Sequence, residues 1–391
     1  MSTKNFYNTI PFAPLKVAAL GNDQELGQKV NHAIQKRRME AAGHCEKPAF
    51  MAAGYHKDNY LIDFDCPRFG TGEGKAVIHE SIRGTDLYII ADPFNHHASY
   101  KMFGQQTQAS PDDLFTNLKR IIMACNGSPR RITVIMPYLY EGRQHIRLLD
   151  ESLDCALALQ ELADMGAENI ITFDAHDDRV QNAVPNHGFD NFYTSYQFIQ
   201  NILNTQPDIT IDEKHFAVIS PDEGGVKRAV YYAELLGVDM GMFYRRLDYS
   251  KSINGKHPVA SVAFLGKPLA GKDVIILDDM IASGTTMLDA ARNVRKQNAR
   301  KIFLCATFGL FSDGIESIDL AYKEGLFDCL YTTNLCHCPE SLLKKPYYHN
   351  VDLSDYIALI IDTLNHNTSV NEILDATGHI KKLIQERNKS I

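Results

Sequence analysis

Short apolar runs alternate with helical stretches along most of this chain. Continuous apolar runs, rather than alternating ones, are typical of strands that are covered on both faces. Strands are expected at Asp86–Ala91, Ile132–Met136, Asn169–Phe173, Phe216–Ser220, Val274–Leu277, Lys301–Thr307 and Cys329–Thr333. Helical spacing marks Ser152–Met165, Gly225–Leu236 and Asp355–Asn365. The alternation predicts an α/β fold with mostly parallel sheets flanked by helices.

Length, composition and charge set the broad class of the protein. A chain of 391 residues has room for two or three domains. Its 45% hydrophobic and 23% charged residues are typical of soluble globular proteins. A net charge of −8 argues against a nucleic-acid partner, and no apolar run has the length of a membrane span. Residues 1–20 lack the order of a secretory signal, so we expect a cytoplasmic protein without a membrane partner.

The cysteines indicate a reducing compartment. Most of the eight lie in apolar, strand-like surroundings, which is typical of buried thiols rather than of a disulfide framework. Cys336-His337-Cys338 has residue types that bind zinc, but structural zinc sites usually take two spaced ligand pairs. No second pair lies nearby, and we expect no zinc there.

The chain divides at a polar, proline-containing segment around residues 204–214, which separates two strand–helix series. We therefore expect a first domain over residues 1–205 and a second over residues 206–351. The helical segment 352–391 is expected to pack on the first domain, and residues 36–60 read as an irregular insertion.

Charged side chains follow several of the expected strands. In open α/β sheets, ligands bind at the carboxyl ends of the strands. Arg143 and Arg147 follow the strand expected at Ile132–Met136. Acids follow three other strands: Asp174, Asp177 and Asp178, together with His176; Asp222 and Glu223; and Asp278 and Asp279. Carboxylates and imidazole suit a divalent cation, and arginines suit phosphates. The sequence thus predicts a site for a phosphorylated ligand and a metal.

The stretch VIILDDMIASGTTM is the most informative of these. The N-terminus of a helix binds phosphate through its free N–H groups, and Ser283–Thr286 add hydroxyls and a glycine. Asp278 and Asp279 would repel that phosphate but accept hydrogen bonds from neighbouring sugar hydroxyls. The pattern favours a ribose 5-phosphate site over a solvated strand end followed by an ordinary helix N-cap.

This stretch resembles the phosphoribosyl-pyrophosphate (PRPP) motif of type I phosphoribosyltransferases and of ribose-phosphate pyrophosphokinases. Four further segments resemble the pyrophosphokinases and occur in the same order: HESIRG, PYLYEGRQ, ITFDAHDDRVQN and ISPDEGGVKRA. Together with GNDQELGQKV, the resemblance extends from about residue 20 to about residue 335. It identifies the chain as a divergent member of the pyrophosphokinase family.

The resemblance implies two phosphoribosyltransferase-like domains, the second carrying the PRPP motif. It implies transfer of the β,γ-pyrophosphate of Mg-ATP to the C1 hydroxyl of ribose 5-phosphate, which gives PRPP and AMP. It further implies Mg²⁺ as cofactor, and homo-oligomers that are built from dimers and are often hexamers.

The resemblance also assigns roles to single residues. His176 and Asp222 match magnesium-associated positions, and Arg83 and Gly84 match the pyrophosphate loop. ATP contacts fall on Arg143 and Gln144, and on Phe69 and Glu73 in a loop that reaches in from a neighbouring subunit. Asp278 and Asp279 match the residues that bind the sugar hydroxyls. The positions that bind the 5-phosphate match Ser283, Gly284, Thr285 and Thr286.

The catalytic loop departs from the family pattern. Where the family has a Lys and, two residues later, an Arg, this chain has Arg245 and Leu247. We expect Arg245 or Arg246 to supply the catalytic charge, although Arg and Lys are not interchangeable where geometry is tight. Other changes are Thr71, His145, Ala282 and Thr285. Two alternatives stay open: a catalytically weak or inactive regulatory subunit, and a true phosphoribosyltransferase.

Overall fold

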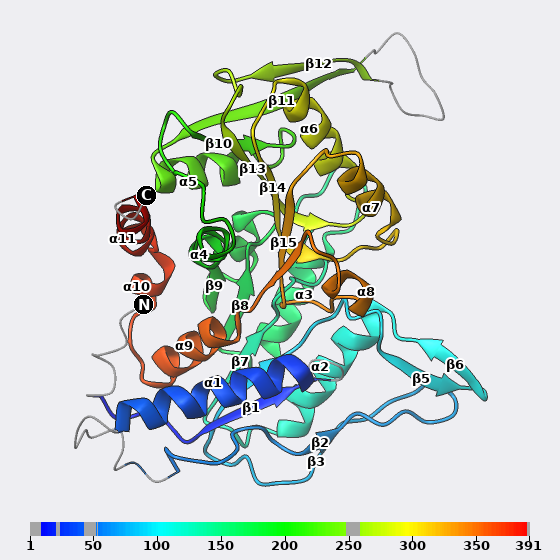
Figure 1. Cartoon of the computed structure of the whole chain (residues 1–391). Helices are drawn as coiled ribbons and strands as arrows, with labels where there is room; N and C mark the ends of the chain where they lie inside the picture. Colours follow the sequence, from blue (N-terminus) through cyan, green and yellow to red (C-terminus); the bar gives the residue numbers. More distant parts are fainter. Residues whose placement is uncertain (1–8, 21–23, 43–51, 53, 248–258, 389–391) are drawn as a thin grey trace. The chain divides into compact units, whose positions relative to one another are not determined.

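The computed structural model describes residues 9–20, 24–42, 52, 54–247 and 259–388. The chain forms two compact units (Figure 1). Unit 1 combines residues 1–193 with residues 334–337 and 352–374. Unit 2 combines residues 194–333 with residues 338–351 and 375–391. The C-terminal segment is therefore divided between the two units.

Unit 1 is built on a parallel sheet of order β1-β4-β7-β8-β9. Its strands are β1 (Leu15–Ala19), β4 (Asp86–Ile90), β7 (Arg131–Ile135), β8 (Asn169–Phe173) and β9 (Gly188–Phe192). The flanking helices are α1 (Gln24–Ala42), α2 (Pro111–Cys125), α3 (Asp154–Asp164), α9 (Ser354–Asn365) and the short α10 (Asn371–Leu374). Helices α2 and α3 pack their apolar sides on one face of the sheet. Helices α1 and α9 lie side by side although they are far apart in the sequence (Figure 1).

Unit 1 also contains small polar elements outside the main sheet. These are the antiparallel pair β2 (Phe64–Asp65) and β3 (Val77–Ile78), the hairpin β5 (Ser99–Met102) and β6 (Gln105–Gln108), and the 3₁₀ helix η4 (Asp178–Ala183). The hairpin turn is tied to the loop that follows β2, because the N–H of Phe103 donates to the carbonyl of Gly70 over 2.7 Å.

Unit 2 has a sheet of order β12-β11-β10-β13-β14-β15-β16 among its described residues, in which only the β11–β12 pair is antiparallel. The strands are β10 (Phe216–Ser220), β11 (Asp239–Leu247), β12 (Val259–Leu265), β13 (Asp273–Ile281), β14 (Ile302–Gly309), β15 (Cys329–Thr333) and β16 (Tyr348–Val351). The helices are α4 (Ser195–Thr205), α5 (Val226–Leu236), α6 (Thr285–Lys296), α7 (Glu316–Lys323), α8 (Glu340–Leu343) and α11 (Thr377–Asn388). The core consists of β10, β13 and β14 with the apolar side of α6.

The predicted α/β class with parallel, helix-flanked sheets is confirmed, and each expected strand is present with small shifts of its ends. The main difference is β13, which continues through Asp278 and Asp279 to Ile281. It does so because β14 runs alongside it and pairs with it as far as Ile281 and Gly309. The expected irregular insertion is wrong for residues 36–42, which continue helix α1, whereas residues 43–51 and 53 lie outside the described residues.

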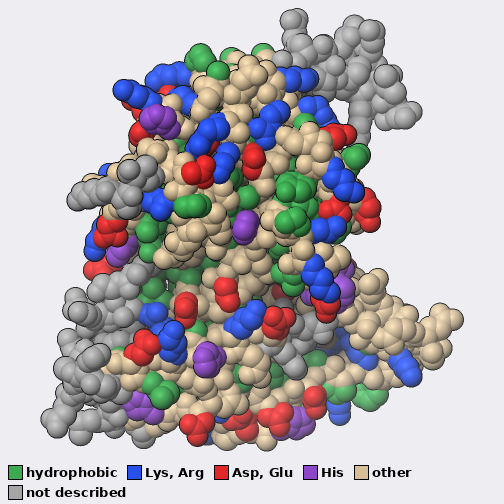
Figure 2. Space-filling view, viewed as in Figure 1, with side chains coloured by type: hydrophobic (Ala, Val, Ile, Leu, Met, Phe, Trp, Pro, Cys, Tyr) green, Lys and Arg blue, Asp and Glu red, His purple; other side chains and the backbone are tan. Residues whose placement is uncertain are grey.

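The visible surface carries charges of both signs. Figure 2 shows Lys and Arg side chains interspersed with Asp and Glu. None of the described helices is long and apolar enough to cross a membrane.

A chain of buried polar contacts joins the C-terminal helix α9 to the rest of unit 1. Arg38 and Asp362 form an ion pair at 2.6 Å, and their side chains are only 1% and 0% exposed. Arg38 also donates to the Oδ1 atom of Asn365 over 3.1 Å. Asn365 in turn donates to Asp86 over 2.8 Å, and Asp86 accepts two hydrogen bonds from Arg131 at 2.8 and 2.6 Å. Polar groups on β4, β7, α1 and α9 are therefore joined directly to one another inside unit 1.

Removing one charge of this network should destabilise the protein strongly. We expect Asp362→Asn to lower the free energy of unfolding by about 3–5 kcal/mol, because it leaves the Arg38 guanidinium buried without its counter-charge. The measurement is urea unfolding of both proteins followed by circular dichroism.

The matched control is the ion pair of Glu25 and Lys29 on the same helix α1, whose side chains are 82% and 43% exposed. Glu25→Ala should cost less than about 1 kcal/mol, as exposed pairs do. Similar losses in the two variants would contradict the prediction.

Candidate active site

The predicted phosphate loop lies at the N-terminus of α6 in unit 2. Gly284 is the N-cap residue and has φ of +78°, a left-handed conformation that glycine adopts without steric cost. Because Gly284 has no side chain, it cannot cap the helix, and among the first N–H groups only that of Thr285 donates to a nearby hydroxyl, Ser283 Oγ, over 3.4 Å. The hydroxyls of Ser283 and Thr285 lie 3.0 Å apart beside these groups. Free N–H groups, hydroxyls and the positive end of the helix dipole together suit a phosphate.

Two adjacent carboxylates precede this loop on β13. Asp279 is buried, with 3% of its surface exposed. The N–H of Asp279 donates to Asp278 Oδ1 over 2.9 Å, and the N–H of Met280 donates to Asp279 Oδ1 over 3.0 Å. Burial, reinforced by the charge of Asp279, raises the pKa of Asp278 to about 8, whereas the Arg228 guanidinium opposes the shift. Near neutral pH the pair therefore keeps a proton and offers both a donor and acceptors.

Asp222 follows β10, the strand next to β13. Its Oδ1 atom accepts hydrogen bonds from the N–H groups of Gly224 and Gly225 over 2.9 and 3.2 Å. Gly225 must be small, because a Cβ atom there would lie 2.8 Å from Ser220 Oγ. The charge of Asp222 contributes to the raised pKa of Asp278, so the two carboxyl groups belong to one electrostatic site. Unit 2 thus brings together Asp222, the aspartate pair and the phosphate loop.

In unit 1, the segments after the neighbouring strands β7 and β8 meet through two histidines. The rings of His145 and His176 lie 5.3 Å apart between centroids. His145 Nε2 lies 3.5 Å from Asp177 Oδ2, which also pairs with Arg179 at 2.5 Å. Hydrogen bonds from Arg179 lower the pKa of Asp177 to about 2. The predicted ATP segment and metal segment are therefore adjacent.

The remaining predicted residues of unit 1 lie at two edges of its sheet: Arg143 and Gln144 follow β7 beside His145, whereas Arg83 and Gly84 lie at the opposite edge, before β4. Gln144 donates to the carbonyl of Ser152 over 2.5 Å, and Arg143 is exposed. The pyrophosphate loop lies before β4, where Gly84 has φ of +71° and donates to the carbonyl of Ser128 over 2.8 Å. Arg83 is exposed next to it.

The predicted adenine loop is a tight turn that presents an aromatic side chain. The N–H of Phe69 donates to the carbonyl of Glu73 over 2.7 Å, and the Phe69 side chain is 53% exposed. Thr71 donates to Glu73 over 3.0 Å, and Arg68 holds the turn through the carbonyl of Gly72 at 3.0 Å. Among the described residues, no hydrogen bond, ion pair or ring contact links this turn to Arg143.

The predicted catalytic residues are described only in part. The backbone of Arg245 and Arg246 lies in β11, opposite Val262 and Ser261 of β12. Their side chains and residues 248–258 lie outside what the structure describes.

Sequence reasoning assigned no role to three groups that the structure places in these sites. His145 was noted only as a departure from the family pattern, Asp177 only as one of several acids that follow a strand, and Arg228 only as part of a quoted segment. The position of Arg228 in the first turn of α5, directly after a strand end rich in acids, was the signal for a charge facing Asp278.

Comparison with known proteins agrees with this geometry. The N-terminal domain of ribose phosphate pyrophosphokinase matches residues 15–166, and the phosphoribosyl transferase domain matches residues 195–323. A ribose-phosphate pyrophosphokinase of Pasteurella multocida is 30% identical over 321 residues, which cover 80% of this chain and 90% of that protein. The chain belongs to the ribose-phosphate pyrophosphokinase family. It is therefore a transferase of the diphosphokinase class.

Further relatives support the assignment. A ribose-phosphate pyrophosphokinase of Mycoplasma pneumoniae is 29% identical over 318 residues, which cover 80% of this chain and 87% of that protein. The crystal structure of the phosphoribosylpyrophosphate synthetase from Mycobacterium smegmatis matches with a TM-score of 0.70 at 20% identity. The match covers 90% of this chain and 99% of the Mycobacterium smegmatis chain. This likeness confirms the fold of two phosphoribosyltransferase-like domains.

The protonated aspartate pair should make the stability of the protein depend on pH. In the folded protein the pair keeps a proton up to about pH 8, whereas an aspartate of the unfolded chain loses its proton near the ordinary pKa of 3.8. Stability from this site therefore falls as pH rises through that window. In urea unfolding, Asp278→Asn should gain stability relative to wild type between pH 5 and pH 8.

The control is Asp313→Asn, which changes an exposed aspartate of the same unit. Its stability relative to wild type should be the same at both pH values. A pH-independent difference for Asp278→Asn as well would contradict the shared proton.

Proposed function

We propose that this chain transfers the β,γ-diphosphate of Mg-ATP to the C1 hydroxyl of ribose 5-phosphate, which yields PRPP and AMP. The observation that carries the proposal is the turn between β13 and α6 in unit 2. There Asp278 and the buried Asp279 lie shortly before a helix whose N-cap residue, Gly284, has no capping side chain. An anion receptor and a set of hydroxyl acceptors on one strand–helix turn match the two ends of a ribose 5-phosphate.

The sugar would be held at both ends. Its phosphate would accept hydrogen bonds from the first N–H groups of α6 and from the hydroxyls of Ser283, Thr285 and Thr286. Its neighbouring ring hydroxyls would lie against Asp278 and Asp279, and the shared proton lets this pair donate to a sugar oxygen as well. Such fixed contacts orient the C1 hydroxyl, and positioning is a large part of what a protein contributes to phosphoryl-type transfer.

The donor set suits a magnesium ion that arrives with the nucleotide. Mg²⁺ usually binds through one or two protein groups, several waters and the substrate phosphates. Asp222 fits this role, because two N–H groups fix its Oδ1 atom and orient the other oxygen of the carboxylate. His176 is exposed at the end of β8, beside Asp177 and Asp178. When bound, the ion would neutralise charge on the phosphate oxygens.

The ATP site would be completed by a second copy of the chain. Phe69 projects from its turn with more than half of its surface exposed, and Glu73 accepts a hydrogen bond from Thr71 on the same turn. An exposed aromatic ring on a rigid turn suits stacking on an adenine. In the family that this chain resembles, the loop reaches in from a neighbouring subunit, so we expect the turn and Arg143 to meet between subunits of a homo-oligomer.

The second candidate function is a regulatory subunit without activity of its own. The observation in its favour is the catalytic loop, where Leu247 stands in place of a family arginine. Such a subunit would bind both substrates and release no product.

The test is incubation of the purified protein with Mg-ATP and ribose 5-phosphate, with AMP and PRPP separated by ion-exchange chromatography. We expect both products in equal amounts. Release of ADP instead of AMP, or binding of both substrates without any AMP, would contradict the proposal.

The departures in the catalytic loop allow a sharper test. Transfer builds negative charge between the ribose oxygen and the leaving AMP, and Arg245 has the better positional match to the family lysine. Arg245→Ala should lower kcat roughly 10²-fold or more, with substrate affinity changed far less. The matched control Arg246→Ala should have a milder effect, since neighbouring side chains of a strand point to opposite faces. If Arg245→Ala keeps nearly the full kcat, another residue supplies the catalytic positive charge.

A further inference from the structure

Unit 1 exposes a second aromatic ring beside the turn at residues 69–73. Strands β5 and β6 form a hairpin whose two-residue loop is Phe103-Gly104 (Figure 1). The N–H of Phe103 donates to the carbonyl of Gly70, the residue after Phe69, over 2.7 Å. Phe103 is 78% exposed, and Phe69 is 53% exposed. Two exposed rings are therefore carried by turns that are hydrogen-bonded to each other.

Phe103 has a backbone conformation that its residue type rarely adopts. Its φ is +48° and that of Gly104 is +80°, as in the type I′ turns of tight hairpins. Asn, Asp and Gly are the residues preferred at the first central position of such a turn, because they tolerate the left-handed conformation. A phenylalanine there costs stability and leaves an apolar ring in water. Backbone outliers of this kind are concentrated at active sites and ligand-binding sites.

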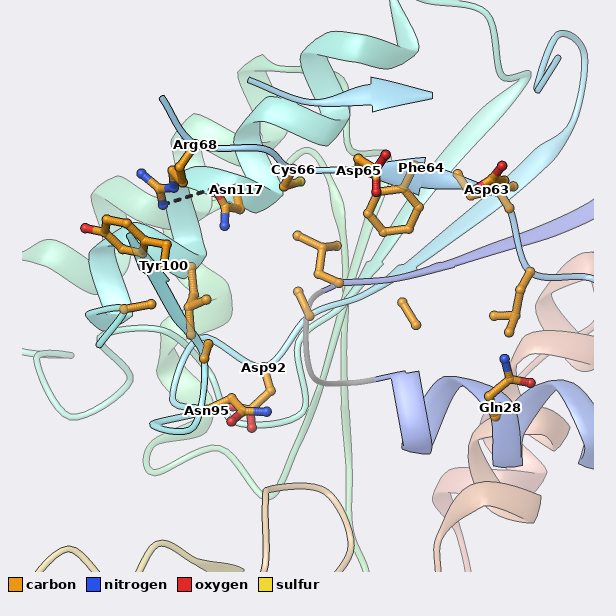
Figure 3. Close-up of a pocket in the computed structure, with 18 of the residues that line it drawn as sticks. Gln28, Asp63, Phe64, Asp65, Cys66, Arg68, Asp92, Asn95, Tyr100 and Asn117 are labelled. Atoms are coloured by element: carbon orange, nitrogen blue, oxygen red, sulfur yellow. Dashed lines mark hydrogen bonds between the residues drawn. The ribbon is translucent and has the colours of Figure 1, made fainter. Parts of the chain in front are cut away.

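The hairpin also supports the turn at residues 69–73 through side chains. A Cβ atom on Gly72 would lie 2.7 Å from Met102 Sδ, so the Met102 side chain lies directly against the turn. Arg68 donates to the carbonyl of Gly72 over 3.0 Å, and its guanidinium lies 4.6 Å from the centre of the Tyr100 ring on β5. Figure 3 shows Arg68 and Tyr100 together at one end of a cavity of about 580 Å³ in unit 1. The hairpin and the turn are thus held together as one support for the two rings.

The surface around the two rings is polar. Among residues 54–110, all of which the structure describes, Phe69 and Phe103 are the only large hydrophobic residues that are exposed. Two single rings in a polar surface do not make the contiguous apolar patch that is typical of a protein interface. They suit a flat molecule with an aromatic face and polar edges, as a purine base has.

From this arrangement we propose that Phe103 binds the adenine of ATP together with Phe69, so that the two rings form one aromatic surface against which the base stacks. The inference rests on the proposed function, which assigns the turn at residues 69–73 to the adenine. Phe103 contacts the base and not the triphosphate. It also favours a purine over the smaller pyrimidine bases, because stacking grows with the area that is covered.

The test measures nucleotide binding and does not depend on catalysis. Isothermal titration calorimetry follows the binding of Mg-ATP, and of magnesium tripolyphosphate, which lacks the nucleoside, to the full chain. Phe103→Asn should weaken ATP binding roughly fivefold or more, as expected for the loss of one base–aromatic stack. Its affinity for tripolyphosphate should stay that of wild type. Phe103→Tyr keeps the ring and should keep the affinity for ATP.

Thermal unfolding separates a binding role from a structural one. Asn adopts the left-handed conformation more readily than Phe, so Phe103→Asn should raise the melting temperature although it weakens ATP binding. A side chain that only holds the fold together would lower both. The matched control is Met39→Ala, which removes another exposed hydrophobic side chain of unit 1 and should leave ATP affinity unchanged.

The outcomes for Phe103 and for the transfer reaction are distinct. Equal ATP affinity in wild type and Phe103→Asn overturns the role of Phe103, even if the protein releases AMP. An equal loss of tripolyphosphate affinity, or dissociation of the variant in sedimentation velocity, also overturns it, because the ring would then support the phosphate site or a contact between copies. Selective loss of ATP affinity in a protein that releases no AMP supports the role of Phe103 and refutes the proposed transfer.

Discussion

In each unit, a buried aspartate and an arginine form an ion pair that joins the amino ends of two neighbouring parallel strands. In unit 1, Asp86 begins β4 and accepts two hydrogen bonds from Arg131, which begins β7. In unit 2, Asp273 begins β13 and accepts two from Arg300, which precedes β14, at 2.7 and 2.5 Å. Both aspartates are fully buried. Bidentate pairs of this kind are geometrically specific, so each pair sets which strands are neighbours and in what register.

Once the amino ends are fixed, the opposite edge of each sheet is available for chemistry. The carboxyl ends of β7 and β8 bring His145 and His176 together, and those of β10 and β13 bring Asp222 to the aspartate pair. Buried carboxylates without counter-charges are costly, and unit 2 limits that cost by keeping a proton on the pair and by placing Arg228 nearby. The sugar hydroxyls of the proposed substrate would therefore meet carboxyl groups that are already protonated and held in place before the ligand binds.

The sequence predicted the central strands but not the edges of the sheets. The central strands are continuous apolar runs, whereas β9 (GFDNF) and β16 (YHNV) mix polar and aromatic residues and resemble loops. The glycine and hydroxyl residues at 283–286 correctly predicted where helix α6 begins. The extension of β13 through Asp278 could not be predicted, since it depends on pairing with β14. Likewise, the partner of Asp177 is set by the neighbouring strand, so no local pattern revealed His145. The site roles themselves stay predictions.

In both units, polar groups gather at the carboxyl ends of the parallel strands, but the charges that they present differ between the units. In unit 2 the strand edge combines acids with the positive end of a helix, which suits a molecule that carries both hydroxyls and a phosphate. In unit 1 the ends of β1 and β4 border a cavity whose lining residues include four carboxylates and Arg68, which already donates to the carbonyl of Gly72. A phosphate would meet a surplus of acidic side chains there, so the phosphorylated substrates of the proposed reaction would bind at the other strand ends instead.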